Sequence, residues 1–307
     1  MPRPKLIFIT GPTAVGKSGL GHQLAREMGG EILNADSLQV FRDMDIGTAK
    51  PSLSEQREVP HHLIDILNPD QLFNVSEFRI RAQSVIEKLH LRRVPILVIG
   101  GTGLYLRVLQ RGIFPCPEPK PEIRKRWQQA ASDQGPEFLW SALKEIDPKA
   151  AERIHPRDTF RLIRALEVPE LTGRPISEWQ QWRPEAESDF DILWIGLFLE
   201  REALYRRINL RTEEMMTRGF LAEVEGLLAK GYSPELKPMQ SLGYRHLTRV
   251  INGDLDLEEA LGLLKRDTRR YAKRQMTWLS KEASLNWLSP QEFDKIRFTI
   301  HQFLDKS

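Results

Sequence analysis

The chain has 307 residues, of which 40% are hydrophobic and 28% charged, as is typical of a soluble globular protein. This length exceeds that of a usual single domain, so we expect one core with a sizeable insertion, or two domains. The formal net charge is only +3, so any surface for nucleic acid must come from local clustering of basic residues.

The content of cysteine and of long apolar runs narrows the class of protein further. The single cysteine, Cys116, excludes a disulfide framework and a zinc site made of cysteines. Residues 1–5 lead directly into an expected strand, which does not fit a signal or transit peptide. No apolar run approaches the roughly 20 residues of a membrane span. We therefore expect a cytoplasmic protein without a membrane partner.

The chain is organised around a glycine-rich loop near its start. Residues 11–18 fit G-x-x-x-x-G-K-[ST], the phosphate-binding loop, with Gly11, Pro12, Thr13, Ala14, Val15, Gly16, Lys17 and Ser18. The apolar run at 6–9 predicts a buried parallel strand before this loop. Residues 20–28 have a helical period that ends at a pair of glycines. The order of strand, loop and helix makes a chance match improbable.

This loop predicts a site for an oligophosphate, as in nucleotide-binding and ATP-binding proteins. Backbone N–H groups at the start of a helix surround an anion, and Lys17 adds a cation directed at the outer phosphates. The Ser18 hydroxyl is a candidate ligand for Mg²⁺, the expected cofactor. The loop does not reveal which reaction the phosphate undergoes.

Two further strand ends carry candidate site residues. Residues 31–33 predict a strand that leads to Asp36 and Ser37, and ligands of doubly wound sheets bind beyond such carboxyl ends. The alternative is that Asp36 caps a helix over 38–41. The clearest core strand, at 95–99, runs into a second glycine cluster that carries Thr102. It lacks the aspartate with which P-loop ATPases and GTPases usually hold Mg²⁺, and this argues against a small-molecule kinase.

Several shorter features complete the first half. We expect a strand at 63–66 and a helix from Ser76 to Arg92 that Ser76 caps. His61 and His62 suggest a metal site, but neighbouring residues of an extended chain point to opposite sides and rarely share an ion.

The middle of the chain predicts a helical insertion. Residues 114–121 contain four prolines, which is typical of an extended linker. Strand patterns are then absent until 191–199. We therefore expect a first core segment at 1–114, a helical insertion at 115–189 and a second core segment at 190–307. On an expected helix over 157–171, Arg157, Arg161 and Arg164 share one face, which is either solvated or a binding surface.

The last third predicts helices over 202–216 and 220–228, a loop at 240–245 with an exposed Tyr244, and a long helix from Leu257. Six of the ten residues from Lys265 to Arg274 are basic. The apolar seam of this helix predicts that four of its cations project outward and two face the cleft. The outward set is Lys265, Arg266, Arg269 and Lys273, and the inward pair is Arg270 and Arg274. A merely solvated face is the alternative.

Taken together, these motifs resemble the tRNA dimethylallyltransferases, also called tRNA isopentenyltransferases. The resemblance runs nearly end to end and rests on the order of residues 11–18, 34–42, 45–51, 61–65, 100–105, 153–156, 161–168 and 269–278. It implies an α/β fold with a P-loop NTPase-like parallel sheet and an all-helical insertion that grips the anticodon stem of tRNA. It also implies a transfer of a dimethylallyl group from dimethylallyl diphosphate to N6 of the adenosine immediately 3′ of the anticodon.

The resemblance also implies roles for individual residues. Asp36 is the expected general base, and Thr102 lies near the reacting centre. Arg211 joins the residues at 11–18 in holding the diphosphate. The expected contacts to tRNA are Asp36, Ser37, Leu38, Gln39, Thr102, Arg124, Phe160, Arg161, Leu162, Ile163, Arg164, Ser241, Leu242, Gly243, Tyr244 and Arg245.

One position departs from the family pattern, because Phe160 stands where a glutamine is usual. A hydrogen-bonding group is lost there, so that contact is either stacking or absent. Two alternatives to tRNA modification stay open beside the kinase. They are prenyl transfer to a free adenine nucleotide and an RNA-binding module without catalysis. The sequence contains no heptad seam, and we expect a monomer.

Overall fold

The computed structural model describes residues 2–113, 120–181 and 188–305. The chain forms two compact units, one of Met1–Gln110 with Ser188–Ser307 and one of Arg111–Glu187. These limits lie within a few residues of the expected insertion. Most of the proline-rich linker predicted at 114–121 lies outside the described residues. Among the described helices, none is long and apolar enough to cross a membrane.

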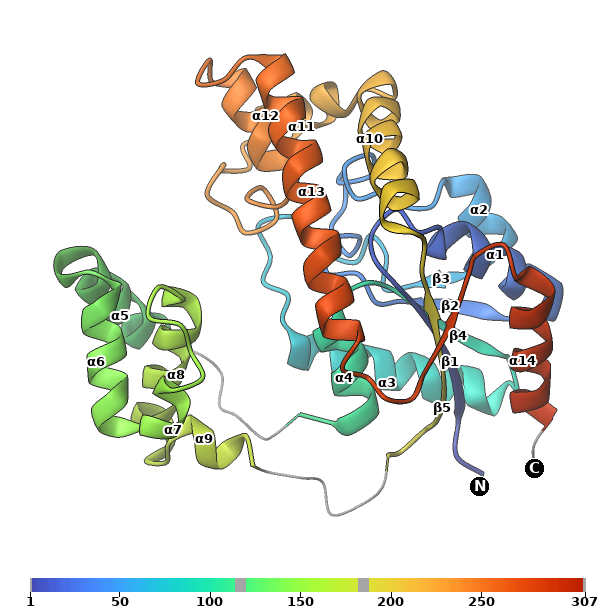
Figure 1. Cartoon of the computed structure of the whole chain (residues 1–307), viewed down its shortest axis with the longest axis horizontal. Coiled ribbons are helices and arrows are strands. Elements are labelled where there is room, and N and C mark those ends of the chain that lie inside the picture. Colours follow the sequence, from blue (N-terminus) through green and yellow to red (C-terminus); the bar gives the residue numbers. More distant parts are fainter. Residues whose placement is uncertain (1, 114–119, 182–187, 306–307) are drawn as a thin grey trace. The chain divides into compact units, whose positions relative to one another are not determined.

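Within the described residues, six strands form one sheet in which all paired strands are parallel (Figure 1). The strand order is β3-β2-β4-β1-β5-β6. The strands are β1 (Lys5–Thr10), β2 (Glu31–Asn34), β3 (His61–His62), β4 (Ile96–Ile99), β5 (Asp191–Leu197) and β6 (Leu285–Leu288). The predicted parallel sheet is therefore confirmed, and β6 is an additional edge strand.

The register of the sheet brings three loops together. Ile99, the last residue of β4, is paired with Ile9 of β1 and with Asn34 of β2. Because the three strands run in the same direction, the loops that follow them start at the same edge. The phosphate-binding loop, the Asp36 turn and the second glycine cluster are consequently neighbours.

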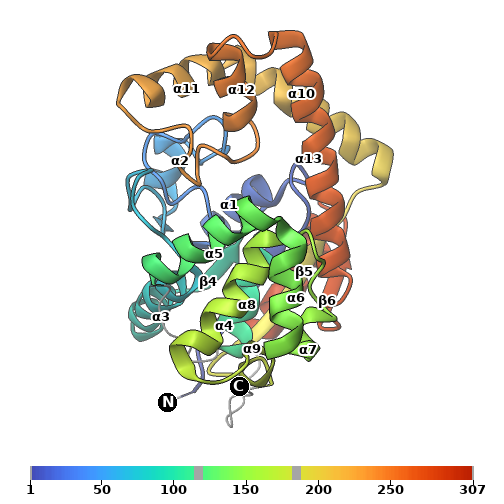
Figure 2. The ribbon, with the colours of Figure 1, turned by 90° about the vertical axis from the view of Figure 1, so that its left-hand side faces the viewer.

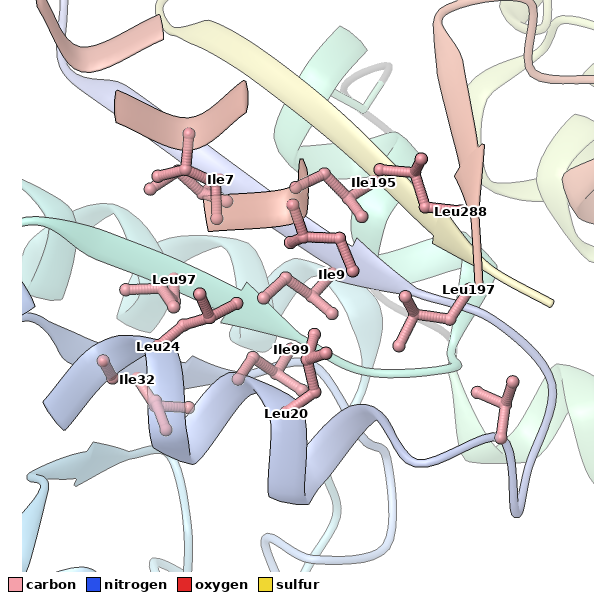
Figure 3. Packing of buried hydrophobic residues seen from close by; sticks show 14 of the residues in the cluster. Ile7, Ile9, Leu20, Leu24, Ile32, Leu97, Ile99, Ile195, Leu197 and Leu288 are labelled. Carbon is pink, nitrogen blue, oxygen red and sulfur yellow. The ribbon is translucent and has the colours of Figure 1, made fainter. Parts of the chain in front are cut away.

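Helices cover both faces of the sheet because side chains of a strand alternate between its faces. Ile7 and Ile9 point to one face, and Leu6 and Phe8 to the other. The first face packs on α1 (Lys17–Met28), α10 (Arg201–Thr217) and α14 (Phe293–Asp305), and Figure 3 shows apolar side chains of the strands and of α1 that belong to this cluster. The second face packs on α3 (Val75–Leu91) and α4 (Gly103–Arg111).

A third apolar cluster lies at the carboxyl edge of the sheet. It joins the last turn of α10 to helices α11 (Phe220–Ala229), α12 (Tyr244–Ile251) and α13 (Leu257–Leu279), and to the chain around Met44. In Figure 1 the orange helix α13 extends from this group down toward α4. Ala272 of α13 belongs to the core beside the sheet, so one helix connects both clusters. The short helix α2 (Leu53–Glu58) lies between β2 and β3 in sequence.

The second unit is a helical bundle with an apolar core of its own (Figure 2). Its helices are α5 (Pro121–Gln134), α6 (Pro136–Ile146), α7 (Pro148–Ala151), α8 (Thr159–Thr172) and α9 (Ile176–Trp179). Asp158 caps α8 by accepting a hydrogen bond from the Arg161 N–H, and Gly173 ends the helix. Arg157 therefore precedes the helix. The prediction that it lies on the helix was wrong.

Two local expectations were wrong. The strand expected at 63–66 lies earlier, at His61–His62, since Leu63 and Asp65 have positive φ angles of 62° and 54° that an extended strand does not allow. Helix α3 is capped by Asn74 and not by Ser76, because the Asn74 side chain accepts hydrogen bonds from the N–H groups of Ser76 and Glu77.

The separate apolar cores predict that the sheet unit folds without the helical unit. Replacing residues 112–187 by a flexible Gly/Ser linker removes the whole cluster of α5–α9 and none of the clusters around the sheet. We expect the shortened protein to unfold cooperatively in urea, with the far-ultraviolet signal of an α/β protein. Loss of a cooperative transition would show that the two units form one folding unit.

Candidate functional site

The phosphate-binding loop has the predicted strand-loop-helix context, since it connects the end of β1 to the first residue of α1, Lys17. Gly16 precedes that helix with a φ of 106°, a conformation that side chains rarely adopt. The Lys17 ammonium donates hydrogen bonds to the carbonyls of Gly11 and Pro12, at 3.0 and 2.8 Å. The cation is thereby held beside the loop that the sequence assigned to phosphate.

A second cation stands next to Lys17. The Arg211 guanidinium, on α10, donates a hydrogen bond to the Thr13 hydroxyl at 3.2 Å. The pKa of Lys17 is lowered to about 7, mainly by burial and also by the nearby Arg211 charge, while the Asp36 carboxylate acts in the opposite direction. Burial also lowers the pKa of Arg211, against the attraction of Asp36 and Glu214. Two partly desolvated cations in one place favour a polyanionic ligand.

Asp36 lies in a tight turn after β2. Its carboxylate accepts a hydrogen bond from the Leu38 N–H at 2.9 Å, and no helix follows over 38–41. The alternative that Asp36 caps a helix is therefore wrong. The Thr102 hydroxyl accepts a hydrogen bond from the Ser37 N–H at 3.2 Å, which ties the second glycine cluster to this turn. Asp36 and Thr102, the two residues expected at the reacting centre, are therefore linked through the backbone of Ser37.

These elements surround a solvent-open cleft. Its walls include the expected residues Thr13, Lys17, Ser18, Asp36, Gln39 and Arg211. Ser37, Leu38 and Thr102 are not among its lining residues and support the Asp36 turn instead. The lining also includes residues that the sequence did not mark as site residues: Ile32, Asn34, Thr48, Ala49, Pro51, His61, Ile99, Gly100, Gly101, Tyr271 and Gln275.

Two of these additional residues come from α13. Gln275 contacts the phosphate-binding loop directly, and Tyr271 lies one turn earlier on the helix. Burial, with the nearby Asp36 charge, raises the pKa of Tyr271 to about 12, so its hydroxyl stays protonated at neutral pH. A polar residue at an otherwise apolar seam position was the signal that could have identified Gln275 from the sequence.

The residues expected to contact tRNA from the helical unit have different environments. Phe160 is 68% exposed, and the Arg161 side chain is also exposed. Leu162 and Ile163 are buried in the bundle core. Arg124 and Arg164 pair with the fully buried Glu167 carboxylate, at 3.2 and 2.8 Å. Part of the expected surface is thus internal packing, which the helical period alone does not reveal.

The loop expected at 240–245 also differs from its prediction. Tyr244 is fully buried in α12, packs on Phe220 and donates a hydrogen bond to the Glu223 carboxylate at 2.6 Å, so the expectation of an exposed aromatic was wrong. Gly243 is buried beside it, whereas Ser241 and Leu242 are half-buried. Arg245 keeps part of its side chain exposed and pairs with Asp267 of α13 at 2.9 Å.

The basic helix presents a different set of cations from the expected one. Lys265 pairs with Glu213 at 2.7 Å, and Arg269 donates a hydrogen bond to Asn209 at 2.9 Å, so both are tied to α10. The exposed set is Arg266, Arg270, Lys273 and Arg274. Arg270 and Arg274 were expected to face the cleft and do not line it. The neighbouring α10 provided partners that the sequence of α13 alone could not indicate.

The described residues contain no group of three or more His, Cys, Asp or Glu side chains that could hold a metal ion. His62 pairs with Glu31 at 2.7 Å, whereas His61 lines the cleft, so the two histidines do not share a site. The exposed Ser18 hydroxyl at the cleft suits Mg²⁺ that is held mainly by phosphate oxygens and water.

A phosphate-binding loop with two neighbouring cations and a carboxylate, all lining one cleft at the edge of a parallel sheet, is typical of P-loop-type enzymes. Two family models match the sequence, IPP transferase over residues 39–282 and isopentenyl transferase over residues 4–65. The chain belongs to the IPP transferase family.

Relatives agree with this assignment. The chain is 49% identical to tRNA dimethylallyltransferase 2 of Geotalea uraniireducens, over 97% of each chain. It is 48% identical to the protein of the same name from Syntrophus aciditrophicus, over 98% of this chain and 97% of the relative.

Solved structures show the same similarity. A tRNA isopentenylpyrophosphate transferase from Bacillus halodurans superposes with a TM-score of 0.73 at 36% identity, over 99% of this chain and 97% of that one. A eukaryotic dimethylallyltransferase acting on tRNA gives a TM-score of 0.79 at 28% identity, over 97% of this chain and 77% of that one.

The lowered pKa of Lys17 predicts a specific pH dependence of stability. Its folded-state value of about 7 lies below the ordinary value of 10.5, so between these pH values the unfolded chain binds more protons than the folded chain. The free energy of unfolding should therefore gain a contribution that rises from about pH 7 to about pH 10. Lys17→Met should abolish that contribution, measured as the difference between urea titrations at pH 7 and pH 9.5.

The matched control is Lys88→Met, which removes an exposed lysine from α3. It should leave the pH dependence of the wild type unchanged. Identical pH dependence in the wild type and in Lys17→Met would contradict the desolvation of Lys17.

Proposed function

We propose that this protein transfers a dimethylallyl group from dimethylallyl diphosphate to N6 of the adenosine immediately 3′ of the anticodon in tRNA. The observation that carries the proposal is that the Lys17 loop and Asp36 line the same cleft. A polyanion can bind on one side of this cleft while a carboxylate meets the acceptor on the other. The family membership supports the proposal independently.

The reaction can be written with the residues of the cleft. The N6 amine attacks the allylic carbon of the donor, the bond from that carbon to the diphosphate oxygen breaks, and diphosphate leaves. Lys17, Arg211 and the backbone N–H groups of the loop stabilise the charge that develops on the leaving oxygens. An exocyclic amine is poorly basic and therefore a weak nucleophile. Asp36 assists its attack by accepting the proton that N6 loses.

Mg²⁺ is part of the proposal, with the Ser18 hydroxyl as its ligand from the chain. Such an ion would neutralise diphosphate charge next to the two cations. We also propose that the protein acts as a monomer in the cytoplasm.

A kinase is less well supported. Strand β4 is followed by two glycines, Thr102 and a third glycine, without the carboxylate that holds Mg²⁺ in P-loop kinases. Asp65, which follows β3, is committed to an ion pair with the buried Lys50. Prenyl transfer to free AMP requires no cations beyond the cleft, whereas α13 presents several.

The tRNA contacts are proposed to come from both units. In the helical unit, Phe160 and Arg161 are exposed, and an exposed aromatic can stack on an unpaired base. In the sheet unit, Arg245 and the exposed cations of α13 can contact phosphates. The adenosine must leave the stack of the anticodon loop to enter the cleft, which costs a few kcal/mol that such contacts can supply.

A labelled-donor assay tests the proposed function. The protein is incubated with labelled dimethylallyl diphosphate and either unmodified tRNA or AMP, and the RNA is then digested to nucleosides. We expect label in the adenosine next to the anticodon and none in AMP. Label in AMP alone would establish the free-nucleotide alternative, and no transfer to either would overturn the proposal.

Asp36→Asn tests the general base. The amide oxygen can still accept the Leu38 N–H, so the turn should persist while the proton acceptor is lost. We expect a single-turnover rate lower by about 10²–10⁴, with tRNA affinity within a few fold and an unchanged melting temperature. An unchanged rate would show that Asp36 only stabilises the turn and is not the general base.

The exposed cations of α13 predict the salt dependence of tRNA binding. Each phosphate contact releases condensed counterions, so Arg270→Ala combined with Lys273→Ala should weaken binding and reduce the log–log salt slope by roughly one to two units. Filter binding across a salt series gives the slope. The control pair is Arg81→Ala with Lys88→Ala on the exposed face of α3. Equal salt slopes for both pairs would show that the cations of α13 form a solvated face that does not contact tRNA.

A further inference from the structure

The side chain of Gln275 bridges two loops that are far apart in sequence. It projects from α13, is only 8% exposed, and lines the cleft. Its amide oxygen accepts the Thr13 N–H at 2.8 Å, and its amide nitrogen donates to the Gly101 carbonyl at 3.0 Å. One side chain thus satisfies a backbone donor of the phosphate-binding loop and a backbone acceptor of the second glycine cluster.

The bridge requires an amide and space around it. Among side chains of this length, only glutamine presents one acceptor and two donors on the same planar group. Reversing the amide would place its nitrogen against the Thr13 N–H and its oxygen against the Gly101 carbonyl, so the observed orientation is the only one that satisfies both. A Cβ atom at Gly101 would lie 2.3 Å from the Gln275 amide nitrogen, so a side chain at 101 would displace the amide from its observed position.

The helix that carries Gln275 is itself fixed. Ala272 and Leu279, on either side of it in the sequence, are buried, and Ala272 belongs to the core beside the sheet. Trp278 packs against the second face of the sheet. The amide therefore has a rigid support, which is what a group needs to hold two loops at a set separation.

Each loop continues from the bridge to one side of the cleft. Thr13 accepts a hydrogen bond from Arg211, which stands beside Lys17. Gly101 precedes Thr102, and the Thr102 hydroxyl accepts the Ser37 N–H next to Asp36. Gln275 therefore links the side of the cleft that contains Lys17 and Arg211 to the side that contains Asp36.

We propose that Gln275 is a positioning residue that fixes the distance between the diphosphate-holding loop and the turn that carries Asp36. The inference rests on the proposed function, in which donor and acceptor occupy the two sides of the cleft. Holding both reactants at a fixed separation favours the reaction step more than the binding of either substrate, because small displacements of reacting groups are costly. Removing the bridge should consequently lower kcat with little effect on affinity.

The primary test compares Gln275→Leu with the wild type. Leucine keeps similar bulk but leaves the Thr13 N–H and the Gly101 carbonyl without this partner. We expect kcat for tRNA prenylation to fall by about 10- to 100-fold, with the Kd for tRNA and the Kd for dimethylallyl diphosphate within about threefold of the wild type. The control is Thr277→Val on the exposed face of the same helix, which should retain wild-type kinetics.

Gln275→Glu separates the two halves of the bridge. The carboxylate can still accept the Thr13 N–H but cannot donate to Gly101, and it adds a negative charge near the diphosphate. We expect kcat to fall as in Gln275→Leu and, in addition, the affinity for dimethylallyl diphosphate to fall. Unchanged kcat in both variants would overturn the inference.

A double-mutant cycle tests whether Gln275 acts through Gly101. Gly101→Ala should displace the amide and lower kcat as much as Gln275→Ala does. The double variant Gly101→Ala with Gln275→Ala should have a kcat less than twofold below that of Gln275→Ala alone. Fully multiplicative losses would overturn the coupling. If the wild-type protein itself transfers no prenyl group, the proposed function is wrong, and the inference that rests on it is wrong as well.

Discussion

The candidate site depends on the parallel register of three neighbouring strands. Because Ile99 is level with both Ile9 and Asn34, the loops after β1, β2 and β4 begin side by side. These loops carry Lys17, Asp36 and Thr102, which are widely separated in sequence. Antiparallel pairing of any of the three strands would carry one of these groups to the opposite edge of the sheet.

The electrostatics of the cleft follow from that convergence. Lys17 and Arg211 lie together in a partly desolvated place, and burial lowers the pKa of each. Asp36 opposes both shifts, so the two cations and this carboxylate are close enough to influence one another electrostatically. A bound diphosphate would supply the missing negative charge and restore the protonated form of Lys17, so ligand binding and the charge state of the cleft are coupled.

The sequence predicted the features that local rules determine. The glycine spacing around Lys17, the strands that lead to residues 11, 36 and 100, and the helical character of the expected insertion all depend on neighbouring residues, and the described residues agree with them. The motif order also identified the family. The burial of Tyr244, the pairing of Arg124 with Glu167 and the ties of Arg269 to α10 depend on packing between distant segments. A single helix pattern reports which residues share a face, but not what covers that face.

Gln275 illustrates the same limit at the site itself. On the sequence it occupies one position of an apolar seam, and only the fold places Thr13 and Gly101 on either side of its amide. Its polar character at a seam position is visible in the sequence, but local spacing does not reveal which loops its amide joins. The residues that position a site are therefore harder to find from the sequence than the residues that contact substrate.

The most direct measurement is a crystal structure of the protein with an unreactive thiol-linked analogue of dimethylallyl diphosphate and an unmodified anticodon stem-loop. The account predicts the diphosphate on the loop of residues 11–18, beside Lys17 and Arg211, with the N6 amine within about 3.2 Å of the Asp36 carboxylate. A diphosphate bound away from this loop, or an adenosine whose N6 does not reach Asp36, would contradict it.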